Sequence, residues 1–172
     1  MSKVLIMDTS ILCVWLKVPN MESCGPDNDR WDYVRVNAKV TEELAAKTTF
    51  VLPLASIIET GNHISQCQGD PYDVALTFAD LIKKTANNVT PWAAFTVQAD
   101  LWSVDKLNEL AVIWPRMAAS RISLGDATIK DVADYYNVQG YSVEIFTGDQ
   151  GLKAYEPRVA PVAVTQPRRR SR

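Results

Sequence analysis

The chain has few of the residues on which several common site chemistries depend. Its three cysteines, Cys13, Cys24 and Cys67, are widely spaced, with no C-x-x-C pair. Structural zinc and a disulfide framework are therefore not expected, and we predict free thiols in a reducing cytoplasm. There is a single histidine, and G-x-S-x-G, Walker A and G-x-G-x-x-G motifs are all absent. Serine-hydrolase chemistry and those two modes of nucleotide binding thus have no basis in the sequence.

Long apolar runs are also missing. No run approaches the roughly 18 apolar residues that a membrane-spanning helix needs. The apolar N-terminal segment contains Asp8 and lacks a small-residue cleavage site, so we do not interpret it as a signal peptide. We expect a cytoplasmic protein without membrane association, and 172 residues suit one domain with a real core.

Charge of either sign is not in large excess. The formal net charge is −2, but residues 166–172 include four arginines, so the rest of the chain carries −6. An acidic body is not typical of a protein that binds nucleic acid by electrostatics alone. We predict one domain over residues 1–165, followed by a basic, disordered tail over 166–172. The tail is either simply solvated or contacts RNA phosphates or an acidic partner.

Short β-branched runs alternate with segments of helical periodicity. This alternation predicts an α/β fold with a mainly parallel sheet. The expected strands are residues 4–7, 49–52, 111–114, 142–147 and 159–164. The expected helices are residues 11–18, 31–47, 54–68, 71–85, 95–110, 126–136 and 150–155, and residues 20–29 and 87–91 are expected to be loops.

Four acidic residues stand where a strand ends or near where a helix begins. They are Asp8, Glu59, Asp126 and Asp149. Each has an ordinary explanation as a helix cap, a turn residue or an exposed helical acid. Together they can gather at the carboxyl edge of a parallel sheet, where carboxylates form a site for a hard cation. The sequence therefore favours a metal-dependent enzyme that acts on phosphodiesters.

The acids occur in the segments DTSIL, S-x-x-E, LGDATI-x-x-x-A and F-T-x-D-x-x-L. In this order the segments resemble the PIN-domain family, which includes the ribonuclease toxins of bacterial toxin–antitoxin pairs. The resemblance covers about residues 4–164. It implies a three-layer sandwich with a central, mainly parallel sheet flanked by helices. It also implies a ribonuclease that uses Mg²⁺ or Mn²⁺ to hydrolyse RNA with metal-activated water.

The resemblance assigns roles to individual residues. Asp8, Glu59, Asp126 and Asp149 would be catalytic, with Asp8, Asp126 and Asp149 as metal ligands and with Thr9, Ser10 and Thr147 supporting them by hydrogen bonds. A toxin would require a protein antitoxin that blocks the acids, and the resemblance makes a homodimer plausible. Residues 20–29 and 87–110 are longer than a minimal toxin-like PIN domain needs.

Other interpretations remain open. The chain could be a PIN-like nuclease of RNA maturation or of DNA, without a toxin role, or a degenerate RNA-binding module. His63 lies one turn after Glu59, where a structural role is more common than a catalytic one. Trp92 and Trp102 are candidates for a partner surface. The cations near the acids in sequence are candidates for holding phosphate, although ordinary surface charge explains them too: Arg116, Arg121, Lys130 and Lys153.

Overall fold

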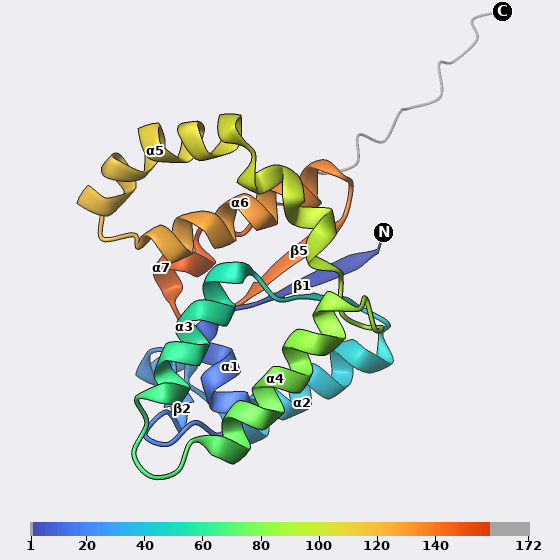
Figure 1. Ribbon diagram of the computed structural model, residues 1–172, viewed down its shortest axis with the longest axis vertical. Helices are drawn as coiled ribbons and strands as arrows, with labels where there is room; N and C mark the ends of the chain where they lie inside the picture. Colours follow the sequence, from blue (N-terminus) through green and yellow to red (C-terminus); the bar gives the residue numbers. More distant parts are fainter. Residues whose placement is uncertain (1, 159–172) are drawn as a thin grey trace, which may run out of the picture.

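The computed structural model describes residues 2–158, which form an α/β protein around a small parallel sheet (Figure 1). The strands are β1 (Lys3–Met7), β4 (Thr49–Val51) and β5 (Ser142–Phe146), in the order β4-β1-β5. Ile6 of β1 lies beside Val51 on one side and Ile145 on the other. Because the three strands are parallel, the segments that follow them start at the same edge of the sheet.

Helices account for most of the remaining chain. They are α1 (Thr9–Trp15), α2 (Tyr33–Ala45), α3 (Leu54–Ser65), α4 (Tyr72–Ala86), α5 (Val104–Ala119), α6 (Leu124–Val138) and α7 (Gln150–Lys153). Two 3₁₀ segments, η1 (Asp27–Asp29) and η2 (Phe95–Trp102), and two short strands, β2 (Ser23–Cys24) and β3 (Trp31–Asp32), complete the elements.

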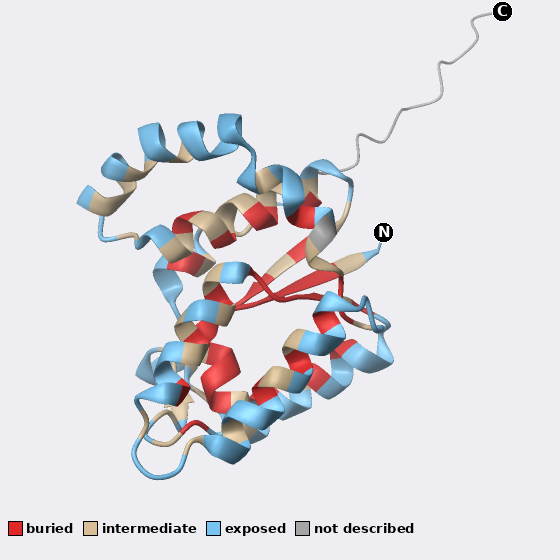
Figure 2. Ribbon diagram, in the orientation of Figure 1, coloured by how far each residue is buried: buried red, intermediate tan, exposed pale blue. Residues whose placement is uncertain are grey.

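Both faces of the sheet are covered. Leu5 and Met7 of β1 pack into a core with α1, α2 and α4, whereas Val4 and Ile6 pack into a second core with α6. This alternation follows from the two-residue period of a strand. Figure 2 shows the buried faces of these helices turned toward the sheet. The expected α/β class with a parallel sheet between helices is confirmed at this level.

One expected strand is wrong. Residues 111–114 lie inside α5, which continues through Pro115. A proline there removes a helical hydrogen bond to the carbonyl four residues earlier. No residue of α5 is buried, so that carbonyl can bond to water instead. The helical pattern of the flanking sequence therefore prevails over the short apolar run.

The expected loop at residues 20–29 also contains structure. Strands β2 and β3 pair antiparallel, with Cys24 opposite Trp31, and η1 lies between them. As a result α2 begins at Tyr33 instead of residue 31, with the Asp32 side chain accepting from the N–H of Arg35. The expected helix at residues 95–110 is likewise divided into η2 and the first part of α5.

Trp92 belongs to the core, which contradicts its prediction as a partner surface. Its side chain is 5% exposed and packs edge-on against Phe50, with ring centroids 5.5 Å apart. Trp102 is exposed. The expected strand at residues 159–164 and the basic tail at 166–172 lie outside the described residues. Within residues 2–158, no helix is both long and apolar enough to cross a bilayer.

Candidate active site

Asp8 is the first residue after β1 and lies at the carboxyl edge of the sheet. Its N–H donates to the carbonyl of Phe146 at 3.1 Å, so the ladder between β1 and β5 reaches this position. The side chain is 5% exposed, and its Oδ2 accepts from the hydroxyls of Ser10 and Thr147, both at 2.7 Å. Burial raises the pKa of this carboxyl, and the hydroxyl hydrogen bonds offset the rise only in part.

The end of β5 brings the fourth predicted acid to the same edge. Besides bonding Asp8, the Thr147 hydroxyl accepts from the N–H of Asp149 at 2.9 Å. Asp149 then caps α7, because its Oδ1 accepts from the N–H groups of Gly151 and Leu152. Thr147 therefore connects the segment of Asp149 to the carboxylate of Asp8.

Glu59 of α3 contacts the start of α1. Its Oε2 accepts from the Thr9 hydroxyl at 3.1 Å. Partial burial raises the pKa of the Glu59 carboxyl, and the hydrogen bond from Thr9 counteracts this. The negative charges of Asp8 and Asp126 raise it further, while His63 lowers it. The charges of Asp8 and Asp126 therefore both act on the carboxyl of Glu59.

Asp126 is the third residue of α6, not its N-cap. Ser123 is the cap, and the two residues form a capping box: the Ser123 hydroxyl accepts from the N–H of Asp126, whose Oδ2 accepts from the Ser123 backbone. The intervening Gly125 lies directly against Glu59. A Cβ added to Gly125 would lie 2.2 Å from Oε1 of Glu59, so glycine lets the Glu59 carboxyl lie against α6, and a larger residue would displace it.

The donor chemistry of this edge fits a hard cation. The side-chain hydrogen bonds above fall on one oxygen each of Asp8, Glu59, Asp126 and Asp149, and the other oxygen is free of them. Within residues 2–158, however, no three Asp, Glu, His or Cys side chains converge closely enough to form a metal-binding group. Mg²⁺ commonly uses only one or two carboxylates with waters and substrate phosphates, so an open site of this kind is compatible with it.

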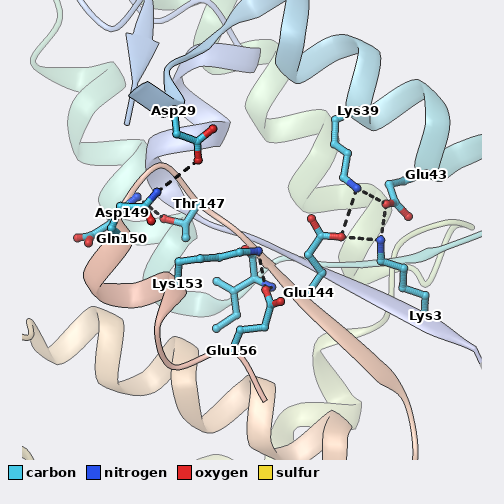
Figure 3. A network of polar contacts seen from close by, with 11 residues as sticks. Lys3, Asp29, Lys39, Glu43, Glu144, Thr147, Asp149, Gln150, Lys153 and Glu156 are labelled. Atoms are coloured by element: carbon cyan, nitrogen blue, oxygen red, sulfur yellow. Dashed lines mark hydrogen bonds and ion pairs between the residues drawn. The ribbon is translucent and has the colours of Figure 1, made fainter. Parts of the chain in front are cut away.

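The β2–β3 segment supplies neighbours that the sequence pattern did not identify. A Cβ at Gly148 would lie 2.6 Å from Sγ of Cys24, so β2 packs against the turn between Thr147 and Asp149. Burial raises the pKa of the Cys24 thiol despite its hydrogen bond with Ser10. Gln150 donates to Asp29 at 3.4 Å, a contact drawn in Figure 3. These contacts join residues far apart in sequence, and no local signal predicts them.

Two of the predicted cations are already paired. Lys130 contacts Asp134 at 2.6 Å, and Lys153 contacts Glu156 at the same distance. Arg116 and Arg121 are exposed, and neither takes part in an ion pair within the described part of the chain. Of the four, only these two arginines remain available for an anionic ligand.

Support for this site comes from the arrangement of its own residues. Comparison of the chain with protein-family models, with curated proteins and with solved structures finds no match.

Proposed function

We propose that this protein is a metal-dependent endoribonuclease of the PIN type, which hydrolyses RNA phosphodiesters. One observation carries the proposal: a buried carboxylate, Asp8, at the carboxyl edge of a parallel sheet is held by the hydroxyls of Ser10 and Thr147. Because burying a charge without a compensating partner is unfavourable, such a carboxylate is suited to binding a cation. The segments around Asp8 and Asp149 are also those in which the resemblance to PIN domains is most specific.

The residues divide into three roles. Asp8, Asp126 and Asp149 would hold Mg²⁺ or Mn²⁺, in part through bound water molecules, and the ion when bound would supply a Lewis acid for the phosphate and lower the pKa of a water molecule. Glu59 would accept the proton of the attacking water, since its pKa is raised toward the range in which a carboxylate acts as a base. Thr9, Ser10 and Thr147 would hold the carboxyl groups of Glu59 and Asp8 in place.

A toxin role, a protein antitoxin and a homodimer remain part of this proposal as consequences of the PIN resemblance. An antitoxin would have to cover the carboxyl edge of the sheet to block the acids. A cytoplasmic location agrees with the three cysteines, all of which are free thiols.

The deciding experiment is cleavage of a mixed RNA pool by the purified protein with Mn²⁺ or Mg²⁺. Asp8→Asn and Asp126→Asn serve as inactive variants, and EDTA removes the metal. We expect cleavage that requires metal and that both variants lose. Equal cleavage by wild type and variants would contradict the assigned site. Cleavage of DNA but not RNA would instead favour the alternative of a PIN-like nuclease that acts on DNA.

A second candidate is a non-catalytic RNA-binding module of the same fold. It is favoured by the lack, within residues 2–158, of three converging metal-binding side chains. Titration calorimetry with Mn²⁺ separates the two candidates. Metal binding that Asp8→Asn weakens supports the nuclease, whereas RNA binding without metal binding or cleavage supports the module.

A further inference from the structure

The turn between α5 and α6 lies beside two parts of the acidic edge. Gly125, just after the turn, abuts the carboxyl group of Glu59. Within the turn, Cδ1 of Ile122 lies 3.9 Å from where a Cβ of Gly151 would be, and the N–H of Gly151 is bonded to Asp149. Figure 1 shows this turn next to α7. The turn and the first residues of α6 therefore lie against both Glu59 of α3 and the segment that follows β5.

Arg121 occupies this turn in an unusual backbone conformation. Its φ is 67°, in the left-handed region that glycine adopts most easily. Two backbone bonds close the end of α5 around it: Arg121 donates to the carbonyl of Ala118, and Ile122 donates to that of Met117. Glycine would serve this turn at least as well, so the turn itself gives no reason for a long cationic side chain.

The Arg121 side chain is exposed and forms no ion pair within residues 2–158. The turn beside the carboxylates of the site thus carries an arginine whose guanidinium has no ion-pair partner among the described residues. An RNA strand that reaches such a site carries a negative charge on every nucleotide and is repelled by the acids. A cation at the rim of the site would offset this repulsion and fix the register of the strand.

We propose that Arg121 binds a backbone phosphate of single-stranded RNA next to the one that is cleaved. The planar guanidinium can donate two parallel hydrogen bonds to phosphate oxygens. Arg116 and Arg158 also lack an ion pair in the described part of the chain, but Arg116 belongs to α5 and Arg158 follows α7, so neither lies in this turn. This inference rests on the proposed function, because it names a residue that positions the substrate of that site.

The test is Arg121→Gly, which removes the cation and also relieves the left-handed backbone. A purely structural role predicts that stability stays the same or rises and that RNA binding is unchanged. The proposal predicts the same stability result but weaker RNA binding, by about fivefold, as expected for one exposed charge contact. The dependence of affinity on salt should also fall by about 0.7 in logarithmic slope, which corresponds to one phosphate of a single strand.

Lys47→Gly is a matched control. Lys47 is exposed, follows α2, and has a φ of 58°, so the substitution also exchanges a cation for glycine in a left-handed turn. It lies just before β4, at the opposite edge of the sheet from the acids. Both substitutions change the net charge equally, so a general charge effect would weaken RNA binding in both.

Binding is measured by fluorescence anisotropy of a short labelled single-stranded RNA with Mn²⁺, in the Asp8→Asn background so that the RNA stays intact. Weakening by Arg121→Gly but not by Lys47→Gly supports the proposal, and equal effects overturn it. If the wild type cleaves RNA with the same KM as Arg121→Gly, the nuclease function stands and this inference fails. If RNA binding depends on Arg121 but the wild type never cleaves, the nuclease function fails and the phosphate contact stands.

Discussion

Two carboxylates near opposite edges of the sheet are similarly buried but are held in different ways. Glu43 at the end of α2 is 3% exposed, and Asp8 after β1 is 5% exposed. Lys3 and Lys39 both pair with Glu43, which also accepts from the Thr48 hydroxyl at 2.5 Å. Figure 3 shows the two lysines between Glu43 and Glu144. Asp8 accepts from two hydroxyls and from the backbone N–H of Ser10, and no ion pair in the described part of the chain includes it.

The pKa shifts of the two groups differ in sign for this reason. Burial opposes the ionisation of Glu43, but its hydrogen bonds with Lys3, Lys39 and Thr48 outweigh burial and lower its pKa to about 2. For Asp8, burial is the larger effect and raises the pKa. The fold thus pairs one buried carboxylate with two lysines and, within residues 2–158, provides no cation for the other. This contrast supports our proposal that Asp8 takes part in binding a cation, whereas Glu43 is held by ion pairs within the protein.

The largest expected effects come from neutralising each carboxylate in turn. Glu43→Gln should lower the free energy of unfolding by about 3 kcal/mol, because the lysines lose a buried partner, with cleavage per folded molecule unchanged. Asp8→Asn should slow RNA cleavage by at least about 100-fold while leaving stability equal or higher, because it removes a buried charge without a cationic partner. Urea unfolding and cleavage assays on both variants measure this.

Loss of stability in Asp8→Asn together with loss of activity in Glu43→Gln would contradict this comparison. It would show that the functional site lies at the other edge of the sheet. Glu144→Gln is a useful reference for the structural cluster. It removes a carboxylate that Lys3 and Lys39 also contact, but one that is less deeply buried. We expect it to destabilise less than Glu43→Gln does.

The second prediction concerns pH. The pKa of Glu43 is about 2 in the folded protein, below its ordinary value of 4.5, so the unfolded chain takes up the proton first as the pH falls. The stabilisation from Glu43 is therefore fully present above about pH 4.5 and is lost as the pH falls toward 2. The difference in unfolding free energy between wild type and Glu43→Gln should shrink across this window. A difference that stays constant down to pH 2 would show that the ion pairs do not lower the pKa of Glu43.

The two regions also differ in how far the sequence predicts them. Asp8 and Asp149 are recognisable because each follows a short apolar strand closely, and parallel strands end at a common edge. This local signal was sufficient to predict where these acids lie. The strands β1, β4 and β5 were predictable for the same reason, since buried parallel strands read as near-continuous apolar runs.

The Glu43 cluster has no comparable signal, because it joins Lys3, Glu43 and Glu144 from three separate elements. The erroneous strand at residues 111–114 shows the same limit. An apolar run of four residues is compatible with a strand or a helix, and here the helical pattern of the flanking residues extends through it, in a helix with no buried residue. The contact between Gly125 and Glu59 depends on how α3 and α6 pack, so the sequence indicates Glu59 but not its neighbour.

The smallest expected effect tests that contact. In Gly125→Ala the new methyl group would displace the Glu59 carboxyl, which is the end of a flexible side chain. Helix α6 should keep its stability or gain some, because alanine favours a helix over glycine. Cleavage should fall by about tenfold, since a displaced base is poorly aligned with its proton.

The shorter side chain of Glu59→Asp should restore part of the lost activity in the Gly125→Ala background, although it lowers activity when made alone. Gly61→Ala is the control, because this glycine of α3 has no atom within 4 Å of an added Cβ. Both alanine variants should be folded, and only Gly125→Ala should cleave slowly. Full activity in Gly125→Ala would mean that the position of Glu59 against α6 is not needed for catalysis. The functional edge would then consist of Asp8 and its β5 partners alone.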